Sequence, residues 1–251
     1  MGSHSNIAEQ EIWDQSYINF QFFEAKDAVT KTVDAFLDSC SFPENTSCFE
    51  LGCFPGRYLV HFGKKYKFVV NGIDSTKYLD NRFIEYLKSE GVKVGTVKRA
   101  DVFDYINTAG KTYDIVYSMG FIEHFEDYLG VLMEHDRLVA KGGLLIIFCP
   151  NFRGSFQYKA HKFFDDENLK IHVVPSMNPE QWAEELVMKG YEIISAGYYG
   201  GFDFWVGSQK RSFAKRFLLR IFSRVRSILK LILRKNSPSY SPYCGIIARK
   251  K

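Results

Sequence analysis

The feature that most constrains the fold is a glycine turn that follows an apolar run. Residues 47–51 are mostly apolar, Gly52 comes directly after them, and Gly56 follows within the same turn. A second apolar run, 68–73, ends in Asp74. In a nucleoside-binding βαβ unit, glycines let the backbone approach the ligand and the acid accepts hydrogen bonds from the ribose hydroxyls. The pattern therefore predicts an enzyme that binds a nucleoside cofactor.

Two departures from the dinucleotide pattern narrow the choice of nucleoside. The glycines are spaced Gly-x-x-x-Gly with Phe54 between them, and Glu50 lies two positions before the first glycine. A bulky ring and a carboxylate are poorly suited to a pyrophosphate on a helix N-terminus. They favour a cationic nucleoside without phosphate.

The segment 50–56 resembles the first motif, Glu-x-Gly-x-Gly-x-Gly, of the class I S-adenosylmethionine-dependent methyltransferases, with Phe54 in place of the middle glycine. Further segments match that family's motifs in the same order, namely Asp74, 100–103, 113–125 and 141–144. The resemblance implies S-adenosylmethionine as the cofactor. The residues that it assigns to cofactor binding are Glu50, Gly52, Cys53, Phe54, Gly56, Asp74, Ser75, Asp101, Val102, Phe103, Ser118, Met119 and Gly120.

A plainer interpretation of these motifs stays open. Gly52 and Gly56 would also serve a tight turn, and Asp74 would also cap a helix. Phe54 is compatible with a scaffold subunit that keeps the fold without catalysis.

Seven strands are expected, and the first five are short apolar runs separated by helical or loop segments, which favours parallel strands with right-handed crossovers. Their expected ranges are 47–51, 68–73, 92–97, 113–118, 144–149, 191–196 and 243–249. The resemblance adds that the last strand runs antiparallel and inserts beside the fifth. We expect an α/β, Rossmann-like, doubly wound sheet in three layers.

Two regions flank the motifs. Residues 1–45 are expected to form a helical region ahead of the methyltransferase domain, which would span 46–251. An aromatic face in the first region includes Trp13 and Tyr17. Such a face usually packs in a core, whereas in the resembling family this region often covers the cofactor, so both residues are lid candidates.

The cysteines indicate a reducing compartment. Their number, five, is odd, and they lack paired Cys-x-x-Cys spacing. No signal segment is visible at the N-terminus. We expect a cytoplasmic protein with reduced cysteines, and the sequence predicts no metal centre.

Residues 208–236 form the most basic segment of the chain. They hold ten Lys and Arg residues and no acid, whereas the rest of the chain holds 23 basic and 29 acidic residues. Apolar residues recur there at three- and four-residue steps, which predicts an amphipathic helix. Such a helix favours binding at the surface of an anionic membrane, peripherally on its inner face. A helix packed on the domain and a nucleic-acid patch remain alternatives, the latter the weaker because the rest of the chain is acidic.

The acceptor is expected near residues 151–190, where aromatic and polar side chains alternate in a way that suits a sugar. Candidate substrate residues are Tyr158, His161 and His172. The amino-acid sequences of segments 52–59, 121–125 and 198–202 resemble those of methyltransferases of bacterial surface-polysaccharide biosynthesis, which act on O-antigen (lipopolysaccharide) or capsule sugars.

The chemistry implied is O-methylation of a sugar hydroxyl, which needs a base. His124 is the best candidate because it follows the fourth strand, and Glu123 would orient it. A lipid-type acceptor, such as a quinone precursor or a phospholipid headgroup, is the alternative.

Overall fold

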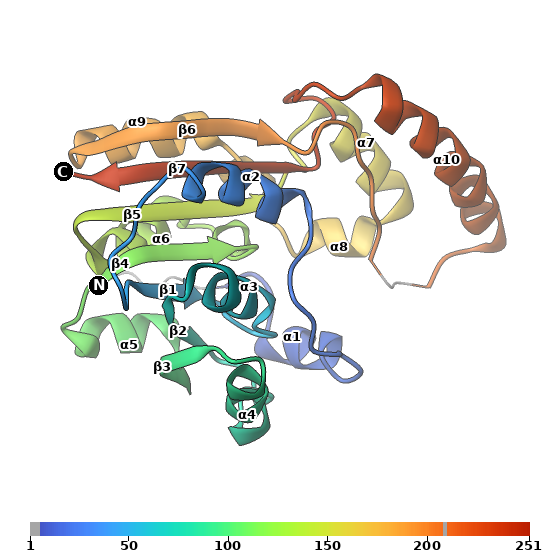
Figure 1. Cartoon of the computed structure of the whole chain (residues 1–251). Coiled ribbons are helices and arrows are strands. Elements are labelled where there is room, and N and C mark those ends of the chain that lie inside the picture. The colour runs from blue at the N-terminus through green and yellow to red at the C-terminus, as the bar shows by residue number, and fades with distance from the viewer. Residues whose placement is uncertain (1–5, 208–209) are drawn as a thin grey trace.

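The computed structural model describes residues 6–207 and 210–251. Seven strands form one sheet in the order β3-β2-β1-β4-β5-β7-β6 (Figure 1). β7 is antiparallel to both of its neighbours, and the other pairs are parallel. This topology confirms the expected fold. The strands are β1 (Ser47–Leu51), β2 (Val69–Asp74), β3 (Lys93–Arg99), β4 (Tyr113–Met119), β5 (Val139–Pro150), β6 (Tyr191–Tyr199) and β7 (Tyr243–Lys250).

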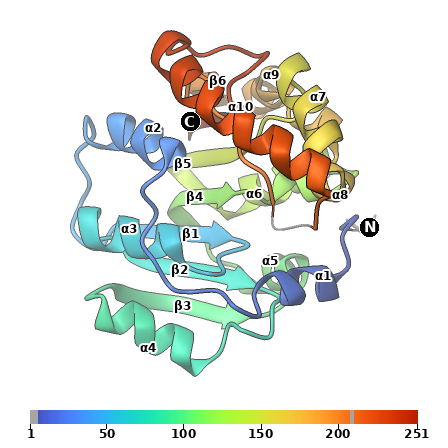
Figure 2. The same ribbon diagram turned by 90° about the vertical axis from the view of Figure 1, so that its right-hand side faces the viewer.

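Helices cover both faces of the sheet. α2, α3 and α4 lie on one face, and α5, α6 and α9 lie on the other (Figures 1 and 2). The helices are α1 (Gln10–Ser16), α2 (Ala28–Leu37), α3 (Arg57–Tyr66), α4 (Asn81–Ser89), α5 (Val102–Ala109), α6 (Tyr128–Leu138), α7 (Ser155–Phe164), α8 (Asp166–Lys170), α9 (Pro179–Met188) and α10 (Phe213–Ile232). Two short 3₁₀ turns, η1 (Ile122–His124) and η2 (Val174–Ser176), complete the chain.

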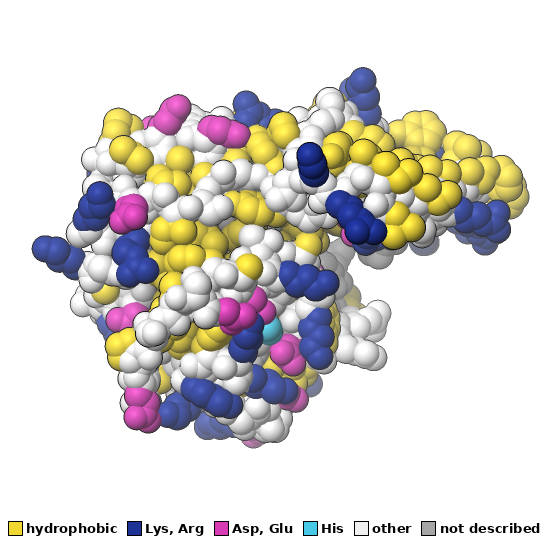
Figure 3. Space-filling model, turned by 45° about the horizontal axis from the view of Figure 1, so that its top comes forward, with side chains coloured by type: hydrophobic (Ala, Val, Ile, Leu, Met, Phe, Trp, Pro, Cys, Tyr) yellow, Lys and Arg dark blue, Asp and Glu magenta, His cyan; other side chains and the backbone are white. Residues whose placement is uncertain are grey.

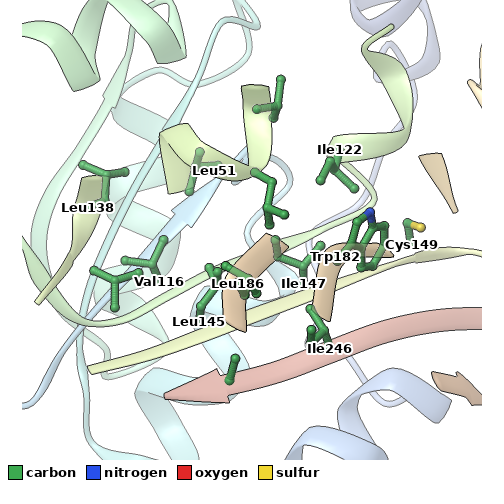
Figure 4. Packing of buried hydrophobic residues seen from close by; sticks show 14 of the residues in the cluster. Leu51, Val116, Ile122, Leu138, Leu145, Ile147, Cys149, Trp182, Leu186 and Ile246 are labelled. Atoms are coloured by element: carbon green, nitrogen blue, oxygen red, sulfur yellow. The ribbon is translucent and has the colours of Figure 1, made fainter. Parts of the chain in front are cut away.

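The two faces of β5 show how alternation builds two cores. Side chains of Leu145, Ile147 and Cys149 pack with α5, α6 and α9, and the intervening residues pack with α2, α3 and α4. Trp182 of α9 lies over Ile147 (Figure 4). Fully burying side chains of this size contributes roughly 1.5–3 kcal/mol each relative to exposure. The packed sheet therefore fixes the positions of the loops that follow its strands.

The carboxyl ends of the parallel strands meet at one edge of the sheet, as expected for this fold. The turn after β1, Asp74 at the end of β2 and Met119 at the end of β4 lie there. α1 lies at the same edge (Figures 1 and 2). The N-terminal segment is therefore placed to cover the loops where a ligand would bind.

α10 confirms a helix within the basic segment, with Ser212 accepting a hydrogen bond from the backbone N–H of Lys215 at 3.3 Å. Residues 208 and 209 of that segment lie outside the described residues. The helix stands beyond the end of the sheet (Figure 1). Within 6–207 and 210–251, no helix has the length and apolar character needed to cross a bilayer.

Candidate active site

The turn after β1 brings the backbone close to Asp74. Gly52 has a φ of +69°, and a Cβ built on it would lie 2.7 Å from the ring of Phe121, so only glycine fits. The Asp74 carboxylate accepts hydrogen bonds from the backbone N–H of Phe54 at 3.1 Å and of Thr76 at 2.9 Å. A carboxylate offers about four acceptor positions. The Asp74 carboxylate therefore keeps acceptor capacity for a ribose hydroxyl.

Glu50 is a buried carboxylate in the same region. It is 3% exposed, and no described residue gives its Oε2 atom a hydrogen-bond partner. Burial raises the pKa of Glu50 well above its ordinary value, although the positive charge of Arg57 opposes the rise. A buried carboxylate without a partner is costly unless a cation neutralises it. Glu50 lines neither of the two cavities described below, so the structure does not place its carboxylate in contact with a ligand there.

Two adjoining cavities follow the expected path of a nucleoside. The inner one lies over Gly52 and Asp74 and has a volume of about 70 Å³. The outer one, of about 690 Å³, is lined by Asp101, Val102 and Phe103, which the family resemblance assigns to cofactor binding. Ser75 lines both cavities. Residues of the N-terminal segment, Asn6 and Gln10, also line both cavities.

The cover over the inner cavity is formed by α1 and the residues before it. The backbone N–H of Ile7 donates to the carbonyl of His124 at 2.9 Å, and the hydroxyl of Thr76 donates to Asp14 at 2.7 Å. Trp13 and Tyr17 both line the cavity. The structure thus places these two residues where a lid would lie.

Several residues assigned to cofactor binding point elsewhere. Phe54 is 5% exposed and packs against Phe20, with ring centroids 4.6 Å apart, so its ring does not line either cavity. Its backbone N–H, not its ring, faces Asp74. The Cys53 thiol is buried against Gly72. Phe54 therefore does not narrow the pocket, contrary to what its bulk suggests in the sequence.

The other assigned residues divide between structure and site. Gly56, with a φ of +81°, begins α3 and faces the ring of Phe83. The hydroxyl of Ser118 is hydrogen-bonded to Nε2 of His135 at 2.9 Å on the far side of β4. Gly120 alone of the group 118–120 lines the inner cavity. Sequence reasoning missed further lining residues that come close only in the fold, namely Asn6, Gln10, Arg99 and Phe121.

His124 and Glu123 lie on η1, and of the two only His124 lines the inner cavity. The Nδ1 atom of His124 lies 2.7 Å from the carbonyl of Ile171, so this nitrogen carries the proton and Nε2 keeps its lone pair. Burial, reinforced by His172, lowers the pKa of His124 to about 3. Burial raises the pKa of Glu123 to about 8. His124 is therefore neutral at physiological pH.

The three candidate substrate residues are dispersed. Tyr158 lies on α7 with the Lys162 ammonium 5.7 Å from its ring centroid. His161 is fully buried and pairs with Asp165 at 3.3 Å. Only His172 approaches the candidate site, with its ring centroid 4.6 Å from that of His124.

A third cavity adjoins the inner one through Gly120. It has a volume of about 270 Å³ and is lined mainly by aromatic and apolar side chains, with one cation. Its polar and aromatic lining residues are Arg57, Tyr58, Phe148, Trp205 and Tyr243, which the sequence did not single out. Because this third cavity adjoins the inner cavity, it is a suitable place for the acceptor molecule.

Comparison with known proteins agrees with this geometry. Residues 49–147 match the family described as "Methyltransferase domain". Among curated proteins, none matches the chain.

Solved structures share the fold. A SAM-dependent methyltransferase from Thiobacillus denitrificans in complex with S-adenosyl-L-homocysteine has a TM-score of 0.59 and 15% identity, over 96% of this chain and 98% of that one. A SAM-dependent methyltransferase from Geobacter sulfurreducens, in complex with the same molecule, gives the same values. Phosphoethanolamine N-methyltransferase 2 from Haemonchus contortus, in complex with S-adenosyl-L-methionine, has a TM-score of 0.54 and 14% identity, over 96% of this chain and 56% of that one.

Proposed function

We propose that this chain is a class I S-adenosylmethionine-dependent methyltransferase that methylates a sugar hydroxyl in surface polysaccharide biosynthesis. The match of residues 49–147 to a methyltransferase domain and the shared fold support the first part of the proposal. The observation that carries the proposal is the third cavity, where Tyr58, Trp205 and Tyr243 surround a space beside Arg57. Aromatic rings stack on the apolar faces of sugars, and an arginine pairs with a phosphate or carboxylate on the same ligand.

The cofactor supplies a methyl group already activated on a positive sulfur, so the protein chiefly binds and orients. We assign Asp74 to the ribose hydroxyls and Asp101, Val102 and Phe103 to the adenine. Trp13 and Tyr17 close the inner cavity and exclude water. These roles follow from the acceptor capacity, burial and placement of each residue.

Transfer requires the acceptor oxygen, the methyl carbon and the sulfur to lie in line. When bound, the cofactor would supply the methyl group to the acceptor oxygen, and the hydroxyl proton would need an acceptor on the protein. His124 is the proposed proton acceptor, because its Nε2 lone pair is fixed by the Nδ1 bond to Ile171. The Oε1 atom of Glu123 lies 3.8 Å from that Nε2 atom, so the Glu123 carboxyl group is its near neighbour.

α10 supports a membrane-associated acceptor. The helix contacts the domain through Phe222, which packs against Phe204 with centroids 5.3 Å apart, and through Arg226 and Lys230, which pair with Asp203. Its apolar side faces outward as a continuous band flanked by basic side chains (Figure 3). The exposed members of that band are Phe213, Phe217, Leu218, Ile221, Val225, Ile228, Leu231 and Ile232.

We therefore propose that this band enters the interface of an anionic membrane. Basic residues beside an apolar face complement anionic headgroups, whereas a nucleic acid would not engage exposed aliphatic side chains. Attachment of the enzyme to the membrane would favour a lipid-linked glycan as the acceptor.

A lipid-type acceptor is the second candidate. Met119, Phe148 and Pro150 make part of the third cavity apolar. A quinone precursor or a phospholipid headgroup would use the same cofactor residues.

A methyl-transfer assay separates these possibilities. The protein would be incubated with labelled cofactor and three acceptor sets: nucleotide sugars, lipid-linked glycans, and quinone precursors with phospholipids. Label in a sugar supports the proposal, and label only in the last set replaces it by the second candidate. Binding of S-adenosylhomocysteine without transfer to any set would indicate a scaffold subunit.

A further inference from the structure

Glu123, His124 and His172 come together although they are far apart in sequence. One candidate ligand atom from each residue lies within 4.8 Å of the other two. Two backbone contacts hold the segments together: the N–H of Val173 donates to the carbonyl of Glu123 at 2.7 Å, and Nδ1 of His124 donates to the carbonyl of Ile171. The cluster is therefore fixed by the fold.

The three side chains present free acceptors to one another. Glu123 is 1% exposed, and neither of its carboxylate oxygens has a hydrogen-bond partner among the described residues. Nδ1 of His172 lies 2.6 Å from the carbonyl of Asn168, so His172, like His124, donates through Nδ1 and keeps the lone pair of Nε2. Histidines that ligate a metal characteristically donate their other N–H to a carbonyl or carboxylate.

We propose that Glu123, His124 and His172 form a binding site for a divalent transition-metal ion, zinc by ligand preference. Two imidazoles and one carboxylate with open coordination positions are a set found at catalytic zinc and iron sites. A cation would compensate the buried Glu123 carboxylate, whose oxygens accept no hydrogen bond from any described residue. Magnesium would bind weakly because it prefers oxygen ligands.

The position of the cluster gives the ion a role. His124 lines the inner cavity, and a Cβ on Gly120, which lines both the inner and the acceptor cavity, would lie 3.4 Å from a carboxylate oxygen of Glu123. The role rests on the proposed function: open positions on the ion would hold the acceptor hydroxyl and lower its pKa. With the ion bound, the proton would pass to solvent and Nε2 of His124 would ligate the ion, whereas without the ion that atom is the proton acceptor proposed above.

Zinc binding to the full-length protein tests the site. Isothermal titration with Zn²⁺ is expected to give close to one equivalent per chain, and His172→Gln and Glu123→Gln are each expected to weaken binding at least about tenfold. His61→Gln is the matched control, because both ring nitrogens of His61 already face carboxylates, those of Glu24 and Asp34. Thermal unfolding of each variant reports whether it is folded.

Co²⁺ provides a readout that needs no variant. Coordination by the cluster is expected to give visible absorption bands more intense than those of the hydrated ion. A hydrated-ion spectrum, absence of zinc binding, or unchanged affinity in folded ligand variants would overturn the site. Titration of the same samples with S-adenosylhomocysteine keeps the two proposals apart, since its binding without zinc binding removes the metal site alone, and its absence removes the proposed function.

Discussion

The indole ring of Trp13 lies edge-on against the imidazole of His124, with ring centroids 4.5 Å apart and planes inclined at 71°. The contact joins the N-terminal segment to the loop after β4 across the inner cavity. Because Trp13 and His124 both line the inner cavity, their contact forms part of its cover. The contact between the two rings is therefore expected to control how long the cofactor stays bound.

Replacing Trp13 with alanine should shorten the residence time of the cofactor product. Loss of an aromatic pair costs about 0.5–1.5 kcal/mol beyond the lost buried area, so dissociation of S-adenosylhomocysteine should accelerate roughly tenfold. Surface plasmon resonance measures the rate directly. Ile12→Ala is the control, because Ile12 lies on the same helix and is 42% exposed. An unchanged rate in Trp13→Ala would exclude the lid.

The stability of the fold should fall in mild acid because of His135. Burial lowers the pKa of His135 from 6.5 to about 4, so between these pH values the unfolded chain binds a proton that the folded chain does not. The contribution of the neutral His135 side chain to the unfolding free energy is thus complete above pH 6.5. It is lost as the pH falls toward 4, and the loss is at most about 3 kcal/mol.

Urea unfolding of His135→Gln at a series of pH values checks this effect. In that window the unfolding free energy of the variant should depend less steeply on pH than that of the wild type, by the equivalent of up to one bound proton. The variant is also expected to be less stable than the wild type. Parallel slopes for the two proteins would show that His135 does not titrate as its burial requires.

Charges placed on the apolar band of α10 should prevent membrane binding. Phe217 and Ile221 are 54% and 44% exposed, and transfer of such side chains into the interface contributes roughly 1.5–3 kcal/mol each. Co-sedimentation with vesicles containing about one third phosphatidylserine should fall at least tenfold for Phe217→Glu/Ile221→Glu.

Met188→Glu is the control for this pair, because Met188 is 72% exposed but lies on α9. Wild-type protein should also bind less at high salt, since the basic flanks attract anionic lipid. Wild-type protein that stays in the supernatant with anionic vesicles would contradict the membrane proposal.

Much of the fold could be predicted because buried parallel strands are apolar runs bounded by turns. β1 has the predicted bounds, Ser47–Leu51, and the other strands differ at their ends. β5 begins earlier than predicted, at Val139, because Val139 pairs with Tyr113 ahead of the glycine turn. The place of β7 between β5 and β6 came from the family resemblance, since periodicity carries no information on strand order.

The site was predictable only where local sequence carries the chemistry. Gly52 and Asp74 belong to a local pattern and line the cavity as expected. Trp205 and Tyr243 line the third cavity, but they come from segments that are distant in the sequence and belong to no recognisable motif. His172 meets His124 because residues 171–173, which follow α8, contact η1, and residues 151–178 were not predicted to be helical.

The most direct test of the account is calorimetric titration of S-adenosylhomocysteine into wild-type protein and Asp74→Asn. Asp80→Asn is the control, because Asp80 caps α4 outside the site. Loss of charge-assisted hydrogen bonds to the ribose should weaken binding of Asp74→Asn about ten- to a hundredfold, with Asp80→Asn unchanged. Absence of binding to the wild type, or equal affinity for Asp74→Asn, would contradict the assignment of this cavity to the cofactor.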